Sequence, residues 1–346
     1  MGQLTERTIT RARGKSPVFV VGCPRSGTTL LYHMILSSGN FAVYRTESNA
    51  FNLLGPKFGD LGVLRNRQKL MDRWLQSMLF TRSGLVAEEI RAKVINECRS
   101  PGDFLRIMME EICRQQKVDR WADCTPTHLL YLREIKESIP DARVIHIIRD
   151  GRDVALSYVR QGWVHPFSWD RKRKLLVAGL FWEWMVRKGR ENGQEIGADY
   201  SEVRYEDLVA SPRETLAKLG QFIDHDLDYD RILASGIGSV REANTSFAGE
   251  SPTKGFNPLS RWKDKFDAGQ LRSFEALVGT LLVELGYPLA SLNLKGVNLL
   301  PGKCARALYF LTFASKHWLK SNTPLGSLLL DTTTMGIGPP AASAPF

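Results

Sequence analysis

The chain has 346 residues, 43% of them hydrophobic and 24% charged, a composition typical of soluble globular proteins rather than disordered or fibrous ones. The net charge of +10 favours anionic partners, but Lys and Arg are spread along the chain without a nucleic-acid-binding motif, so we expect no nucleic-acid partner. The five cysteines lack the CxxC spacing of zinc and redox sites. Residues 1–15 are polar, unlike a signal peptide, so we expect a cytoplasmic protein.

The first two predicted elements are a strand and a helix joined by a glycine loop. Residues 17–22 form an apolar β-branched run that ends in glycine, and apolar residues at helical spacing follow from residue 30. Residues 66–118 mix charged and apolar positions with helical periodicity, which predicts several helices. We interpret residues 50–125 as a helical cap or insertion over the core of the domain.

The later predicted elements alternate between helix and strand. They are a helix at 129–138, a strand at 143–148, a helix from about residue 152, a strand at 201–205 and a helix that ends at residue 286. Strands that alternate with helices favour a parallel sheet. We therefore predict an α/β fold with a central parallel sheet flanked by helices.

Composition divides the chain into a flexible lead at residues 1–15, one domain at residues 16–295 and a tail at residues 296–346. Within the tail, residues 308–320 predict a short basic amphipathic helix, and the final Gly, Pro, Ala and Ser residues predict an unstructured end. Peripheral contact of this helix with a membrane is one interpretation, but its short length favours packing on the domain.

The segment Gly22-Cys-Pro-Arg-Ser-Gly-Thr-Thr has the GxxxxG spacing of a phosphate-binding loop at a strand-to-helix junction. Backbone N–H groups and the positive end of the helix would hold a phosphate there. Thr28 stands where nucleotide triphosphatases carry lysine, which disfavours Mg²⁺-dependent chemistry, and the cation is Arg25 instead. The predicted site consists of Arg25, Ser26, Gly27, Thr28 and Thr29.

At this loop the chain resembles the sulfotransferases that use 3′-phosphoadenosine 5′-phosphosulfate (PAPS), whose loop reads PRSGTT or PKSGTT. Residues 24–29 match that motif throughout, and the resemblance extends from about Pro17 to Pro288. It implies a three-layer P-loop fold and PAPS as co-substrate without a metal. It also implies direct in-line transfer of the sulfuryl group to an acceptor hydroxyl on a small molecule, saccharide, lipid or protein tyrosine.

A second phosphate site is predicted where the strand at 143–148 ends. Arg149 and Ser157 are eight positions apart across the start of a helix, so their side chains can converge on one anion. In the family that the chain resembles, an arginine and a serine at this spacing hold the 3′-phosphate. The alternative is a cluster of Arg–Asp salt bridges that caps the helix.

The resemblance implies further contacts with the nucleotide. Tyr205 lies in a YEDL segment whose tyrosine contacts the adenine in related enzymes, although it could instead be a core residue at the end of a strand. Ser246 and Arg261 are candidates from the segment that closes over the cofactor. An exposed loop with ordinary surface charges is the alternative for Arg261.

Transfer to a hydroxyl requires a base near the sulfuryl group. Glu47 is the predicted base, because it lies where the branch that includes the tyrosylprotein sulfotransferases carries its catalytic glutamate. The alternative is a surface glutamate paired with Arg45. His128 is the competing base, by analogy with the steroid and phenol sulfotransferases, but it lies four residues past the matching basic position instead of two.

Cys124 departs from the family, whose members usually carry lysine at this position. That lysine neutralises charge on the leaving group, so either Arg25 acts alone, another basic residue substitutes, or the protein is slow or inactive. Two other functions also stay open. They are a metal-dependent P-loop small-molecule kinase and a non-catalytic protein that binds PAPS or its desulfated product, adenosine 3′,5′-bisphosphate (PAP). The acceptor pocket is expected under the helices of residues 50–125.

Overall fold

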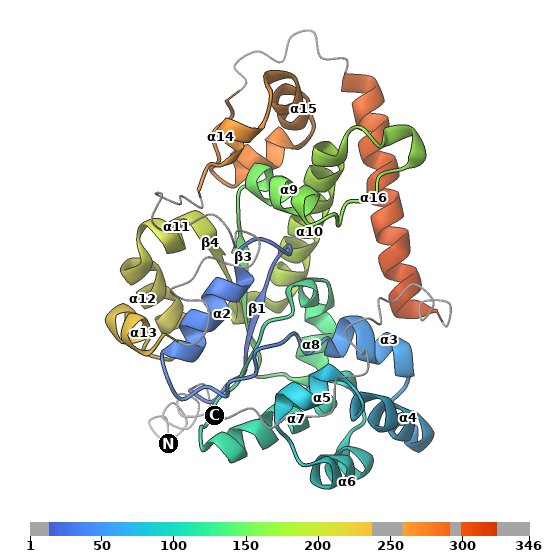
Figure 1. Ribbon diagram of the computed structural model, residues 1–346, viewed down its shortest axis with the longest axis vertical. Helices are drawn as coiled ribbons and strands as arrows, with labels where there is room; N and C mark the ends of the chain where they lie inside the picture. Colours follow the sequence, from blue (N-terminus) through green and yellow to red (C-terminus); the bar gives the residue numbers. More distant parts are fainter. Residues whose placement is uncertain (1–13, 237–258, 291–298, 324–346) are drawn as a thin grey trace.

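The computed structural model describes residues 14–236, 259–290 and 299–323, and its centre is a parallel sheet of four strands (Figure 1). In order across the sheet the strands are β2 (Ala122–Asp123), β1 (Val18–Val21), β3 (Arg143–Ile148) and β4 (Tyr200–Arg204). The three strands predicted from the sequence are β1, β3 and β4. The sequence does not predict β2, because two residues are too few to show a periodicity.

The central strands send side chains alternately into two hydrophobic cores, one on each face of the sheet. In β1, Val18 and Val20 join one core, Phe19 and Val21 join the other, and all four are fully buried. Burial on both faces explains why the sequence of this strand is a continuous apolar run. Because helices cover both cores, the predicted three-layer α/β fold is confirmed.

The helices on the face of Val18 and Val20 are α2 (Thr28–Ser37), α11 (Tyr205–Ala210), α12 (Pro212–Ile223) and α13 (Tyr229–Ser235). The helices that contribute to the other core include α8 (Leu132–Ser138), α9 (Gly151–Arg160) and α10 (Lys174–Ile196). In Figure 1, α2 and α10 accordingly lie on opposite sides of β1. Because β1 and β3 pair in parallel, their carboxyl ends lie side by side.

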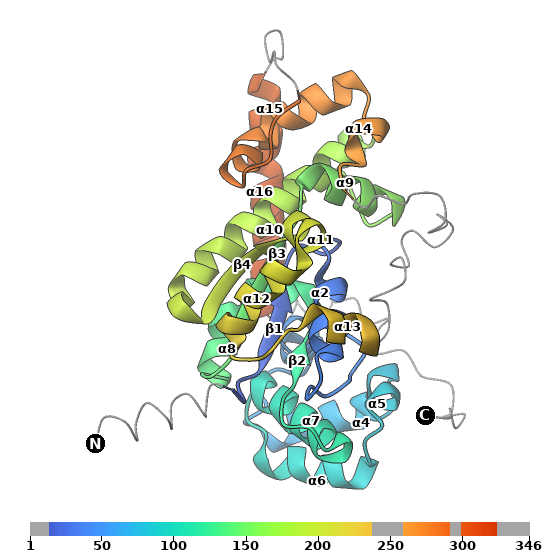
Figure 2. The ribbon, with the colours of Figure 1, turned by 90° about the vertical axis from the view of Figure 1, so that its left-hand side faces the viewer.

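The helices expected over residues 66–118 are present. They are α4 (Leu64–Trp74), α5 (Met78–Ser83), α6 (Ala87–Glu97) and α7 (Pro101–Gln116), and the short helix α3 (Gly55–Phe58) precedes them. Figure 2 shows α4 to α7 at one end of the molecule, with α14 (Trp262–Lys265) and α15 (Ala268–Glu284) at the other. The start of α7 follows from its sequence, because the Ser100 hydroxyl accepts a 3.0 Å hydrogen bond from the Asp103 N–H.

The tail helix is longer than predicted, because α16 spans Leu299–Asn322 instead of residues 308–320 alone. It packs on the domain, where Arg306 donates hydrogen bonds of 2.7 and 2.9 Å to Glu183 of α10 and the Tyr309 hydroxyl donates one of 2.9 Å to Asp170. No helix in the described ranges is long and apolar enough to cross a membrane. The division into lead, domain and tail stays a prediction.

A buried network of charges joins α9 to α15. The Arg152 side chain is 1% exposed and donates hydrogen bonds of 2.7 Å to Asp150 and 2.7 Å to Glu275, which is fully buried. The Arg152 guanidinium also lies 3.7 Å from the centre of the Trp262 ring. Because buried carboxylates are costly unless a cation balances them, this arginine fixes where α15 packs against α9.

Arg152→Met should lower the free energy of unfolding by about 3–5 kcal/mol, because it leaves two buried carboxylates without their cation. The matched control is Arg91→Met. Arg91 pairs with Asp72 at 2.9 Å on the surface, with both side chains largely exposed, so its loss should cost less than about 1 kcal/mol. Urea unfolding followed by circular dichroism measures both changes. Similar small losses in the two variants would contradict a structural role for the Arg152 network.

Candidate active site

The glycine loop leaves β1 at the edge of the sheet beside β3. A Cβ on Gly22 would lie 2.5 Å from the carbonyl oxygen of Ile147, so this close approach requires glycine. The loop then passes through left-handed backbone at Arg25 (φ 75°) and Gly27 (φ 99°) before α2 begins at Thr28. The strand, loop and helix thus have the order that the GxxxxG spacing predicts, with the positive end of α2 at the loop.

Tyr205 covers the loop at Gly27. It is the first residue of α11, and not part of the strand that was expected to include it. A Cβ on Gly27 would lie 2.3 Å from the buried Tyr205 ring, and the Arg149 guanidinium lies 4.3 Å from the centre of that ring. Tyr205 therefore contacts both predicted phosphate sites.

Arg25 joins the two predicted phosphate sites. Its Nε donates a 2.9 Å hydrogen bond to Ser157 Oγ, and its carbonyl oxygen accepts a 3.4 Å hydrogen bond from Arg149 Nη1. Arg149 and Ser157 therefore meet at Arg25. Arg149 also pairs with Asp153 at 3.8 Å, as the salt-bridge alternative expects. Burial and the neighbouring charge of Arg149 lower the pKa of Arg25, as expected for two cations held close together.

The hydroxyl residues of the loop differ in their surroundings. Ser26 is fully buried, and its hydroxyl has no hydrogen-bond partner within the described ranges. Thr28 is buried and hydrogen-bonded to the Cys124 side chain, whereas Thr29 is exposed. Because a buried hydroxyl without a partner is costly, the loop contains a group that a bound anion would satisfy.

Glu47 lies in the segment between α2 and the π-helical turn Ala50–Leu54. Its side chain is open to water but is surrounded on most sides by protein, and this partial desolvation raises its pKa to about 7, with a smaller contribution from Asp123. The charge of Glu47 also raises the pKa of Tyr158, although burial raises it more. Among the described residues, no ion pair joins Glu47 to Arg45. A carboxylate at this position is accessible from solvent.

His128 is buried in a 3₁₀ turn, Pro126–Tyr131, and both of its ring nitrogens have partners. The backbone N–H of Phe51 donates to Nε2 at 3.3 Å, so the proton lies on Nδ1, which donates to Asp123 at 2.8 Å. Burial opposes ionisation of Asp123, but the electrostatic effect of His128 and the hydrogen bonds from His128, Ser48 and Thr125 hold its pKa below the ordinary value. This environment favours a structural role for His128.

Cys124 is a neutral thiol at neutral pH. Burial raises its pKa well above the ordinary value, and the charges of Asp123 and Glu47 raise it further. It neither replaces the charge of the expected lysine nor supplies a thiolate nucleophile.

Arg261 lies directly before α14 and is partly buried. Burial raises the pKa of Tyr205. The positive charge of Arg149 lowers it, and that of Arg261 lowers it by a smaller amount, so Arg261 lies within electrostatic range of Tyr205. The backbone N–H of Trp262 donates a 3.0 Å hydrogen bond to Asp153, which fixes this segment on α9. The other candidate of this segment, Ser246, lies outside the described residues.

A model of the sulfotransferase family matches residues 17–229, which include the glycine loop, Glu47, Arg149, Ser157 and Tyr205. The chain belongs to this family. It is 23% identical over 214 residues to a protein-tyrosine sulfotransferase of Drosophila melanogaster, with 60% of this chain and 38% of that protein aligned. It is 27% identical over 158 residues to sulfotransferase 1 family member D1 of Rattus norvegicus, with 39% and 53% aligned. The chain spans about half or less of these curated relatives.

Two solved structures similar to this sulfotransferase-family chain are sulfotransferase domains. One is from the olefin synthase of Synechococcus PCC 7002, with 18% identity, a TM-score of 0.46, and 86% of this chain and 94% of that domain covered. The other is from the curacin biosynthetic pathway, with 17% identity, a TM-score of 0.47, and coverage of 79% and 98%.

Sequence reasoning misses two residues that adjoin the loop. Tyr158 forms a hydrogen bond with Cys23, the second residue of the loop motif, and the Trp163 ring centre lies 5.7 Å from the Arg25 guanidinium carbon. Burial raises the pKa of Cys23, and the hydrogen bond with Tyr158 acts against this increase. Neither residue belongs to a motif, so the sequence offers no local signal for them.

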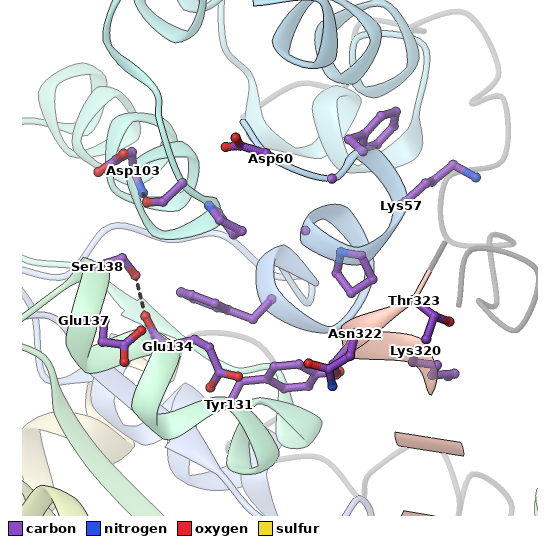
Figure 3. Close-up of a pocket in the computed structure, with 18 residues that line it drawn as sticks. Lys57, Asp60, Asp103, Tyr131, Glu134, Glu137, Ser138, Lys320, Asn322 and Thr323 are labelled. Carbon is purple, nitrogen blue, oxygen red and sulfur yellow. Dashed lines mark hydrogen bonds between the residues drawn. The ribbon is translucent and has the colours of Figure 1, made fainter. Parts of the chain in front are cut away.

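A pocket of about 1010 Å³ lies beside the helical region where the acceptor was expected (Figure 3). Its charged lining residues are Lys57, Asp60, Asp103, Glu134, Glu137 and Lys320. None of the described residues that line it belongs to the glycine loop or includes Glu47. It is also not lined by Tyr158 or Trp163, the two residues that adjoin the loop, so nothing in its described lining connects it to the loop.

The contact between Gly27 and Tyr205 predicts that Gly27→Ala destabilises the protein more than Gly39→Ala. Both glycines have left-handed backbone, with φ of 99° and 90°, but a Cβ on Gly39 would meet nothing within 4 Å. The backbone cost of roughly 1–2 kcal/mol is thus common to both variants. Overlap with the Tyr205 ring should add about 1–3 kcal/mol in Gly27→Ala, which denaturant unfolding measures. Equal losses would contradict close packing of Tyr205 on the loop.

Proposed function

We propose that this protein transfers the sulfuryl group of PAPS to an acceptor hydroxyl and releases PAP. The observation that carries the proposal is the meeting of two predicted phosphate sites at Arg25, within a chain of the sulfotransferase family. PAPS carries one phosphate on the 5′ position and one on the 3′ position of its ribose. The two sites offer one arginine for each phosphate, Arg25 and Arg149. Metal-independent binding fits this arrangement, because arginine side chains and the helix end supply the positive charge.

The loop is proposed to hold the 5′-phosphosulfate and Arg149 with Ser157 the 3′-phosphate. The unpartnered Ser26 hydroxyl fits an anion in the loop. Ser157 Oγ accepts a hydrogen bond from Arg25, so its own O–H can donate to a phosphate oxygen. Tyr205, which packs between the loop and Arg149, is the proposed contact for adenine, and Arg261 and Ser246 remain candidates for the segment that closes the site.

The proposed chemistry is a single in-line displacement. The acceptor oxygen forms a bond to sulfur while the bond between sulfur and the bridging phosphate oxygen breaks, and Glu47 takes the proton of the acceptor hydroxyl. Arg25, Thr28 and Thr29 stabilise the charge that develops on the departing phosphate. Glu47 suits this role because it is accessible, and a pKa of about 7 makes it a stronger base than an ordinary carboxylate.

The assignment of Arg149 predicts a selective loss of affinity. In calorimetric titrations without metal, PAP should bind the wild-type protein, and Arg149→Ala should weaken PAP binding by at least about tenfold. Binding of AMP, which lacks the 3′-phosphate, should change by less than about twofold on this substitution. The exposed Arg171 offers a control of equal charge, and Arg171→Ala should leave both affinities unchanged.

Equal losses of PAP and AMP affinity in Arg149→Ala would contradict the assignment of the 3′-phosphate. A preference for ATP that requires Mg²⁺ would instead favour the small-molecule kinase. Selective PAP binding without any transfer would favour the non-catalytic PAP-binding protein.

Glu47→Gln should keep PAP affinity and reduce transfer of labelled sulfate from PAPS by at least about 10²-fold, because the base is removed.

The pH dependence of the reaction gives a further test, because a carboxylate accepts the proton only when it is ionised. With a pKa of about 7, kcat/KM of the wild-type enzyme should rise through pH 7 and level off above it, and the residual activity of Glu47→Gln should lack this rise. Glu88→Gln, at an exposed position, is the control. Full turnover in Glu47→Gln would move the base to His128.

A further inference from the structure

A second pocket, of about 370 Å³, lies between α10 and the tail helix α16, which run side by side in Figure 1. Its volume is within the range of pockets that bind small molecules. Its walls are largely aromatic, with Trp163 from the connection after α9, Phe181 and Trp184 from α10, and Phe313 from α16. These rings provide flat apolar surfaces on more than one side of the pocket.

The pocket shares a wall with the glycine loop. Tyr158 lines it and forms a hydrogen bond with Cys23 of the loop. Trp163 also lines it, and its ring centre lies 5.7 Å from the Arg25 guanidinium carbon. Like the larger pocket, this one is not lined by the loop or by Glu47, but Tyr158 and Trp163 connect its wall to Cys23 and Arg25.

A second connection leads from the pocket to the segment of Glu47. Asn52 lines the pocket and donates a 2.9 Å hydrogen bond to Asn49 Oδ1, and Asn49 Nδ2 in turn donates a 3.2 Å hydrogen bond to the Glu47 carbonyl. The Asn52 Oδ1 atom is buried and has no hydrogen-bond partner in the described part of the chain. Since a buried acceptor without a partner is unfavourable, this oxygen fits an O–H or N–H group of a ligand.

The charge of the pocket comes from α16. Lys316 and Lys320 lie one helical turn apart and both line it, and none of its described lining residues is Asp or Glu. Burial lowers the pKa of His317, which lies on the same wall, and Lys320 lowers it further, so this imidazole stays neutral near pH 7. The larger pocket of Figure 3 differs, because four carboxylates line it. The smaller pocket therefore favours an anionic group.

We propose that this pocket is the acceptor site and that the acceptor is a small molecule with a flat apolar body, a hydroxyl group and an anionic group. The inference rests on the proposed sulfuryl transfer. The hydroxyl lies toward Arg25 and Glu47, the apolar body lies among the aromatic rings, and the anionic group lies near Lys316. The tail helix is thus a wall of the acceptor site as well as a packing element.

Two probes that differ by one carboxylate group test this proposal. They are 6-hydroxy-2-naphthoate and 2-naphthol, which share the two-ring body and the hydroxyl group. Calorimetric titration in the presence of saturating PAP, at low salt, should give a dissociation constant roughly fivefold lower for the naphthoate, as expected for a solvent-screened ion pair. Label from PAPS should be transferred to the hydroxyl of the naphthoate.

Three variants locate the binding. Lys316→Gln should bring the two dissociation constants close together, whereas Lys303→Gln, which removes the same charge from an exposed position on α16 outside the pocket, should preserve the preference. Thr312→Trp fills the pocket from α16 and should abolish binding of both probes. Circular dichroism and PAP titration check that each variant is folded, since none of the three residues contacts the loop.

The outcomes separate this inference from the proposed function. If wild-type protein fails to bind PAP, the proposed function is wrong. If PAP binds and the naphthoate has no advantage, or Thr312→Trp still binds both probes, or Lys303→Gln removes the preference as fully as Lys316→Gln, the acceptor site proposed here is wrong while the nucleotide site stands.

Discussion

The candidate site depends on the placement of one arginine. The left-handed backbone at Arg25 directs the chain so that its side chain bonds to Ser157 of α9 and its carbonyl oxygen to Arg149 after β3. The loop after β1 and the turn after β3 are thereby joined through a residue that carries charge. Burial lowers the pKa of Arg25, and the neighbouring charge of Arg149 lowers it further, because two guanidinium groups so close repel each other. An anion bound between the two groups would reduce this repulsion, which is the physical reason why the proposed bisphosphate fits this arrangement.

The rest of the fold holds α9 where Arg25 needs it. The Trp182 indole of α10 donates a 3.0 Å hydrogen bond to the Arg149 carbonyl, and a Cβ on Gly151 would lie 2.4 Å from the same ring. Arg152 binds α9 to α15 from another side. Helix α10 also binds α16, because Arg306 of α16 donates a hydrogen bond to Glu183 of α10. The tail helix is thus connected through α10 to Arg149 beside the glycine loop.

The sequence predicts the parts of this structure that local patterns encode. The apolar runs of β1 and β3, the glycine spacing and the Arg149–Ser157 interval each follow from a few adjacent residues, and the structure brings them together at Arg25. The sequence does not predict the pocket between α10 and α16. Trp184 and Phe313 are 129 positions apart, with ring centres 5.7 Å apart, and no local periodicity relates them. Tyr205 illustrates the same limit, because one position decides whether it ends β4 or begins α11.

The substitution of cysteine at position 124 and the basicity of Glu47 are linked. The Cys124 thiol is buried, hydrogen-bonded to Thr28 and within electrostatic range of Glu47. A lysine at this position would place a cation near the carboxylate and lower its pKa, which would weaken it as a base. A neutral thiol leaves desolvation as the dominant influence, and the pKa of Glu47 rises to about 7. In the proposed reaction, this chain therefore has less positive charge at the leaving group but a stronger base at the acceptor, and Arg25 is left to neutralise the departing phosphate.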